Sequence, residues 1–228
     1  MSSFIIVTFG ICVMLVFAPL SGGLMNGKPL EYKITTTWDN QTVDAKQVVT
    51  LNLSSAPEGL AIDIHCPFHN EKLPSAKSGR FSRLFDFEGV ALFFLSSSTL
   101  NYLELQFGPG GHYLAYYLNG VRDVRNDSVI ISNYEASINK EDDTWTGRAI
   151  IPTDVFPAGV DSFNAFSLHG KNPKQYMALY PVPFNASQVP NMHNIASYRP
   201  IDLSKLIEVK ESIVPKVHIS SGNSLLPC

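Results

Sequence analysis

The segment His65-Cys66-Pro67-Phe68-His69 brings two imidazoles and a thiol within five residues of one another. Imidazole nitrogens and thiolate sulfurs are the ligands that zinc prefers in proteins. The spacing does not favour zinc here, because His65 and His69 lie across a turn that contains Pro67 and no second pair of ligands is suitably spaced. We therefore expect no bound metal, and a surface histidine beside a structural cysteine.

Two acidic residues, Asp63 and Glu104, lie on the polar faces of expected strands. Glycoside hydrolysis requires a facing pair of carboxylates. Nothing in the sequence makes this pair converge, and exposed acids on antiparallel strands are ordinarily solvated. The usual nucleophile, zinc-protease, dinucleotide and phosphate-loop motifs are also absent from the sequence. We expect that the chain is not an enzyme, and the alternative is a glycan hydrolase that uses Asp63 and Glu104.

Four residues are candidates for binding a ligand without catalysis: His169, Arg148, Tyr180 and Trp38. A polar ring with an aromatic side chain near its rim suits the hydroxyls and the CH faces of a sugar. His169 has an alternative role as a strand-end histidine that bonds the backbone before a turn at Gly170. Trp38 lies beside a glycosylation motif, so we expect it to be partly exposed.

A haem cofactor would need axial ligands such as histidine and methionine. Met177, Met192 and His193 supply these residue types, but we place them in loops. We expect no cofactor.

The elements that must position these side chains have the pattern of β-strands. Runs of five to eight residues rich in β-branched, leucine and aromatic residues alternate with Gly, Pro, Asn, Asp or Ser, and helical periodicity is nearly absent. Such spacing is typical of a β-sandwich, here antiparallel and jelly-roll-like, with at most one or two short helices. The expected strands span residues 32–37, 48–54, 60–66, 90–95, 102–107, 113–119, 129–137, 145–151, 163–169 and 176–180.

The residue patterns of two expected strands indicate which of their faces are buried. In residues 60–66, Leu60, Ile62 and Ile64 share one face while Asp63 and His65 share the other, which is typical of a half-buried strand. Residues 90–95 are apolar throughout, which favours a strand covered on both faces.

Three further local features are expected. Residues 108–111 are Gly-Pro-Gly-Gly between two alternating runs, which predicts an antiparallel hairpin. Alternation also places Trp145 in the core. A short helix is expected to begin at Asp202.

Composition excludes several classes of protein. The 228 residues are 45% hydrophobic, 11% aromatic and only 16% charged, so the chain should fold as one large domain and not remain disordered. The net charge is -3 and there is no block of Lys or Arg, so we expect no nucleic-acid partner.

The first 23 residues indicate the compartment. They contain no Asp, Glu, Lys or Arg, and residues 4–20 are almost wholly apolar. We interpret residues 1–23 as a secretory signal peptide cleaved near Leu24, with a signal anchor as the alternative. The expected organisation is then a sandwich domain at 24–211 and a flexible tail at 212–228, in a secreted chain without stable membrane insertion.

Two further motifs agree with secretion. Removal of the leader, which contains Cys12, leaves Cys66 and Cys228. These two cysteines either form one disulfide or remain unpaired. Sequons occur at Asn40, Asn52, Asn126 and Asn185, and we expect glycosylation at polar or turn-like positions of this kind.

Longer strings carry a resemblance to a known family. The chain resembles, over about residues 32–200, the uncharacterised animal and bacterial family that includes the human chromosome 4 open reading frame 33 protein. The strings that carry the resemblance are Trp38-Asp39, Leu84-Phe-Asp-Phe-Glu88, Trp145-Thr-Gly-Arg-Ala-Ile-Ile-Pro152, Phe163-Asn-Ala-Phe-Ser-Leu-His-Gly170 and Ala178-Leu-Tyr-Pro-Val-Pro183.

A more distant resemblance concerns the order of the strands. The order of the expected strands is similar to that of family 9 carbohydrate-binding modules and the related DOMON domains. These are β-sandwiches that bind sugars or, in some members, haem. Ala91 and Met177 stand where acidic residues are usual, which removes any ligand role of those carboxylates. The resemblance implies a non-catalytic binding protein with a glycan as partner. Besides the hydrolase, the alternative is a structural extracellular protein with no small-molecule ligand.

Overall fold

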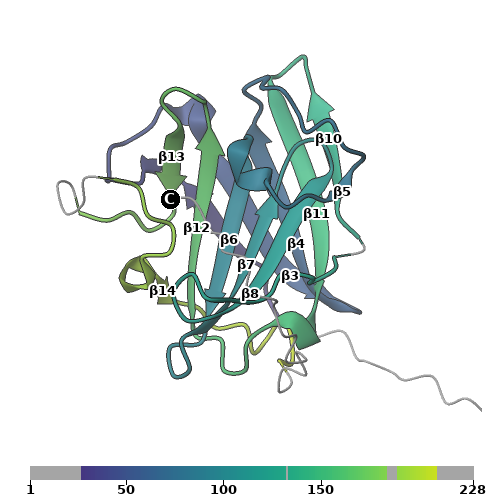
Figure 1. Cartoon of the computed structure of the whole chain (residues 1–228), viewed down its shortest axis with the longest axis vertical. Helices are drawn as coiled ribbons and strands as arrows, with labels where there is room; N and C mark the ends of the chain where they lie inside the picture. The colour runs from purple at the N-terminus through teal and green to yellow at the C-terminus, as the bar shows by residue number, and fades with distance from the viewer. Residues whose placement is uncertain (1–26, 132, 184–188, 210–228) are drawn as a thin grey trace, which may run out of the picture.

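Two β-sheets packed face to face make up the computed structural model, which describes residues 27–131, 133–183 and 189–209 (Figure 1). The helical segments among these residues are single 3-10 turns: η1 (Ala45–Gln47), η2 (Leu84–Asp86), η3 (Thr153–Val155) and η4 (Ile195–Ser197). No helix in this part of the chain is long and apolar enough to span a bilayer. The predicted all-β sandwich is confirmed, while the expected leader and tail lie outside the described residues.

The first sheet has five strands in the order β1-β3-β4-β11-β10, and every neighbouring pair is antiparallel. Its central strands, β4 and β11, are nine residues long and pair along their whole length. The strands are β1 (Leu30–Ile34), β3 (Val49–Ala56), β4 (Gly59–Pro67), β11 (Thr144–Pro152) and β10 (Glu135–Asn139).

The second sheet has nine strands, seven of them in the order β2-β13-β12-β6-β7-β8-β5, while β14 pairs with β12 and β9 with β8. The hairpin predicted at residues 108–111 joins β7 to β8, with Phe107 opposite Tyr113. The strands are β2 (Thr36–Thr37), β13 (Gln175–Ala178), β12 (Ser162–His169), β6 (Gly89–Leu95), β7 (Asn101–Phe107), β8 (His112–Asn119), β5 (Gly79–Arg80), β14 (Arg199–Pro200) and β9 (Val124–Asn126).

The main core lies between the two sheets. The inward residues of β4 and β11 meet those of β6, β7 and β12, and Trp145 is among the largest fully buried side chains at 1% exposed. The predicted alternation of β11 is confirmed, because Trp145, Gly147 and Ala149 are buried while Thr146 and Arg148 are exposed. The fold therefore directs Thr146 and Arg148 to the outer face of the five-stranded sheet.

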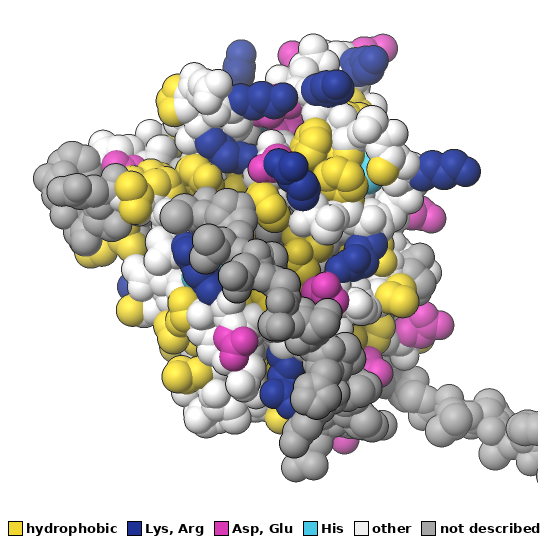
Figure 2. Space-filling view, in the orientation of Figure 1, with side chains coloured by type: hydrophobic (Ala, Val, Ile, Leu, Met, Phe, Trp, Pro, Cys, Tyr) yellow, Lys and Arg dark blue, Asp and Glu magenta, His cyan; other side chains and the backbone are white. Residues whose placement is uncertain are grey.

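The outer face of the nine-stranded sheet is also covered, by a second apolar cluster. Phe81 and Leu84, before β6, and Met192 and Tyr198, after β13, pack on the strands from that side. Figure 2 shows this face from outside, with hydrophobic side chains among the charged ones. The prediction that β6 is covered on both faces is confirmed, since all seven of its residues are buried.

This covering layer makes one expectation wrong. Glu104 of β7 was expected to face solvent, but it is 3% exposed, because the outer face of its sheet lies beneath the second cluster. The Gln106 side-chain amide donates a hydrogen bond to Glu104 Oε1 over 2.7 Å, and Oε2 has no partner among the described residues. Burial raises the pKa of Glu104 to about 7.

Two expected elements differ in the structure. The strand predicted at 129–137 begins only at Glu135, because Val129 and Ile131 enter the core from a non-strand segment. The helix expected at Asp202 is a single turn, in which the Asp202 carboxylate accepts a hydrogen bond from the Ser204 N–H over 2.9 Å.

Candidate functional site

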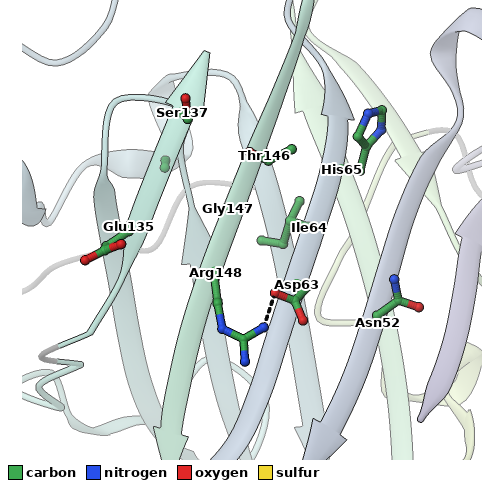
Figure 3. Close-up of a pocket in the computed structure, with 10 residues that line it drawn as sticks. Asn52, Asp63, Ile64, His65, Glu135, Ser137, Thr146, Gly147 and Arg148 are labelled. Carbon is green, nitrogen blue, oxygen red and sulfur yellow. Dashed lines mark hydrogen bonds and ion pairs between the residues drawn. The ribbon is translucent and has the colours of Figure 1, made fainter. Parts of the chain in front are cut away.

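A groove of about 440 Å³ lies on the outer face of the five-stranded sheet, over β3, β4, β11 and β10. Seven of its lining residues are polar or charged and occupy outward positions of these strands, while Ile64, Ala136 and Gly147 contribute from inward positions (Figure 3). Ten residues line it: Asn52, Asp63, Ile64, His65, Glu135, Ala136, Ser137, Thr146, Gly147 and Arg148.

Strand register aligns the polar side chains in two rows. Asn52, Asp63, Arg148 and Glu135 are consecutive cross-strand neighbours on β3, β4, β11 and β10. One step along, His65, Thr146 and Ser137 are neighbours on β4, β11 and β10. The period of two in a strand keeps both rows on the same face. The sheet therefore presents an ordered array of hydrogen-bonding groups.

An ion pair lies near the centre of the groove. Arg148 Nη1 donates to Asp63 Oδ1 over 2.5 Å, with the side chains 56% and 39% exposed. Figure 3 shows the guanidinium of Arg148 turned toward Asp63, while the carboxylate of Glu135 points away from it. The pair fixes the guanidinium, which has five N–H donors, and leaves its remaining donors directed to solvent.

The groove can bind a polar ligand through many neutral and charged hydrogen bonds. It offers a guanidinium, carboxylates, a side-chain amide, an imidazole and hydroxyls, while no Phe, Tyr or Trp is among its described lining residues. Of the four predicted binding residues it contains only Arg148. Sequence analysis missed Asn52, Glu135 and Ser137 as site residues, because placing them beside Arg148 requires the pairing of strands far apart in the chain.

The other three predicted binding residues lie elsewhere. Trp38 and Tyr180 line a narrow crevice beside Met192, over the outer face of the nine-stranded sheet. Trp38 is half-buried there, as expected. His169 ends β12 and lines a separate depression. The prediction that His169, Arg148 and Tyr180 form one polar ring is therefore wrong, because Arg148 belongs to the other sheet and faces away from the core.

The candidate catalytic pair is not assembled. Asp63 lies on the outer face of the five-stranded sheet, whereas Glu104 lies in the nine-stranded sheet beneath its covering layer. The inter-sheet core separates the two carboxylates. The pair proposed for a hydrolase therefore cannot flank one glycosidic bond.

The candidate metal and haem ligands are also dispersed. His65 faces the groove and is exposed, while Cys66 is 2% exposed and points into the core. Within the described ranges, no group of three His, Cys, Asp or Glu is placed to hold a metal ion. Met177 is in the main core, whereas His193 lies on the opposite side of its sheet and contacts the Tyr102 hydroxyl over 2.8 Å.

The structure describes only one of the two cysteines predicted to pair. Cys66 is a free thiol whose pKa burial raises to about 12, and its predicted partner Cys228 lies outside the described residues.

The predicted glycosylation sites differ in their surroundings. Asn40 is exposed in a turn, and Asn126 ends β9. Asn52 differs from the expected turn-like setting, because it is half-buried in the middle of β3. Asn185 lies outside the described residues.

Comparison with known proteins assigns the family. The UPF0462 protein C4orf33 homolog of Rattus norvegicus is 33% identical over 184 residues, which cover 78% of this chain and 90% of that protein. The Homo sapiens UPF0462 protein C4orf33 is 32% identical over the same shares. The chain belongs to the UPF0462 family. The resemblance found in the sequence strings of this UPF0462 protein is thereby confirmed, although no protein-family model matches the chain.

A solved structure has the same fold as this UPF0462 protein. It is a crystal structure from Bacteroides uniformis of a protein provisionally assigned as carbohydrate-binding, with a TM-score of 0.54. The match covers 75% of this chain and 84% of the other, at 13% identity. At this identity the likeness concerns the arrangement of the strands.

Proposed function

We propose that this UPF0462 protein is a secreted, non-catalytic, carbohydrate-binding β-sandwich and that its ligand lies in the groove over β3, β4, β11 and β10. The observation that carries the proposal is the double row of hydrogen-bonding side chains around the Arg148–Asp63 ion pair. Sugar hydroxyls both donate and accept, so they match a surface that mixes carboxylates, amide and guanidinium. The Bacteroides uniformis structure supports the same class of ligand.

The charges in the groove favour binding over hydrolysis. Glycoside hydrolysis needs one carboxylic acid that keeps its proton and one carboxylate. Asp63 accepts a hydrogen bond from the Arg148 guanidinium, so its carboxylate is already engaged within the groove. Glu135 is the neighbour of Arg148 on β10, and its side chain is exposed. Both carboxylates are thus suited to accepting hydrogen bonds from hydroxyls.

A glycan array tests this function. Protein purified from the culture medium of expressing cells is expected to bind a restricted set of glycans and to release no reducing sugar from them. If no glycan on the array were bound, carbohydrate binding would be contradicted. Release of reducing sugar, abolished by Asp63→Asn, would instead establish a hydrolase.

Asn52 links the proposed glycosylation to the proposed groove. Its side chain lines the groove, so an N-linked glycan there would occupy the surface that we assign to the ligand. We therefore expect the secreted protein to carry glycans at Asn40 and Asn126, to lack one at Asn52, and to begin near Leu24. Mass spectrometry of the intact chain and its glycopeptides measures all three. Full occupancy of Asn52, or a retained leader, would contradict this arrangement.

A further inference from the structure

A second depression, of about 420 Å³, lies at the end of the sandwich where β12 leads into β13. It is lined by residues that follow β4 and residues that end β12: His69, Glu71, Lys72, His169, Gly170 and Lys171. Neither the groove residues nor the aromatic crevice take part in it. It is therefore a distinct site.

Two imidazoles form the centre of this site. The rings of His69 and His169 are stacked, with centroids 3.7 Å apart and planes at 9°. Both pKa values lie below the usual histidine range, that of His169 at about 4, because burial disfavours the charged form and, for His169, its stacked neighbour adds repulsion. The rings are therefore neutral at physiological pH, and each presents one N–H donor.

The surrounding charges favour an anion. Lys72 and Lys171 are exposed at the rim, and the ammonium of Lys174 donates to the Phe85 carbonyl close by. Figure 2 shows several Lys and Arg side chains along this upper end of the molecule, where Figure 1 places the end of β12. The one carboxylate in the lining, that of Glu71, already accepts a hydrogen bond from the Gly170 N–H.

Polar groups beneath the site lack partners. His169 Nδ1 is buried and has no hydrogen-bond partner among the described residues. Glu88, 2% exposed, accepts the His69 N–H through Oε2 over 2.8 Å, while its Oε1 is unpartnered. Burial raises the pKa of Glu88 to about 7, which reduces its negative charge near neutral pH.

Gly170 allows the tight turn that follows β12. Its φ is +76°, and a Cβ built there would lie 2.8 Å from the Pro173 carbonyl oxygen. Glycine is the residue that adopts this conformation without strain. The turn therefore brings Lys171 and Lys174 back to the imidazoles.

We infer that the stacked His69–His169 pair, with Lys72 and Lys171 at its rim, binds a compact oxyanion: the sulfate, phosphate or carboxylate group of a small ligand. The lysines attract the anion, and the imidazole N–H groups donate to its oxygens. Binding should draw a proton onto one ring, because a bound negative charge stabilises the imidazolium form.

Histidine side-chain NMR of the full mature protein tests the inference, with inorganic sulfate, inorganic phosphate and glucuronate as separate probes at constant ionic strength. Each effective probe is expected to shift the His69 and His169 resonances saturably and to raise the pKa of at least one ring, while glucose does neither. The comparison among probes identifies which oxyanion is preferred.

Matched variants separate the site from general charge attraction. Lys72→Ala with Lys171→Ala should weaken binding of the preferred anion by roughly tenfold. Lys46→Ala with Lys77→Ala removes two exposed lysines outside the lining and should leave the affinity unchanged.

Three outcomes would overturn the inference. These are no saturable shift of the His69 and His169 resonances with any anion, an equal loss of anion affinity in both double variants, or a shift of these resonances with zinc ions alone. Arg148 plays no part in this site, so the result does not depend on glycan binding in the groove.

Discussion

Replacing Arg148 by alanine is expected to weaken binding of the glycan that the array identifies by roughly 30-fold, or about 2 kcal/mol. The variant removes the guanidinium donors at the centre of the groove and leaves Asp63 without its 2.5 Å partner. The Arg148 side chain is 56% exposed, so the fold should tolerate the change. Isothermal titration calorimetry measures the loss, and the unfolding midpoint should stay within the range of ordinary surface substitutions.

Trp38→Ala is the matched control for this prediction. Trp38 lines the aromatic crevice on the other sheet, so its loss should leave glycan affinity unchanged. Arg148→Lys should recover part of the affinity, because it restores the charge without the planar fork. If Trp38→Ala abolished binding while Arg148→Ala did not, the ligand would lie in the crevice and the assignment of the groove would be wrong.

Replacing Glu104 by glutamine is expected to stabilise the protein in alkaline solution by about 3 kcal/mol and to have little effect in mild acid. Burial raises the pKa of Glu104 from 4.5 to about 7. Between these values the unfolded chain loses the proton while the folded chain keeps it, so this group destabilises the fold progressively as pH rises. Above pH 7 the buried carboxylate is charged, and the destabilisation of the fold by this charge is complete.

Urea denaturation at about pH 5 and about pH 8.5 measures this effect. The comparison with wild type is needed because Glu88 shifts in the same direction and His169 and His193 in the opposite one. Glutamine keeps the acceptor for the Gln106 amide. Glu58→Gln, on an exposed turn, is the control and should show no such pH dependence. Equal stabilisation at both pH values would contradict the titration of Glu104.

Local pattern was sufficient to predict most of the strands. The alternation in β4 and β11, the wholly apolar β6 and the Gly-rich hairpin can each be recognised from the residues of one short segment. Trp145 was placed correctly in the core for the same reason. The strand at 129–137 began too early, because Val129 and Ile131 are buried by a segment without ladder hydrogen bonds.

The site could not be predicted in the same way, because it depends on pairing between distant segments. Asp63 and Arg148 are 85 residues apart, and only the β4–β11 register makes them neighbours. Glu104 was predicted to be exposed because its strand alternates, yet segments before β6 and after β13 cover its face. Similarly, the stacking of His69 on His169 joins the ends of strands in two different sheets.

The lengths of the outermost strands bear on how this protein avoids aggregation. The nine-stranded sheet terminates in β2 and β5, which have two residues each and offer too few free backbone groups to template another chain. The five-stranded sheet terminates in β1 and β10, which have five residues each. Exposed charges on these strands, Glu31 and Lys33 on β1 and Glu135 on β10, oppose intermolecular strand addition. Neutralising them would open the route by which monomers stack edge to edge.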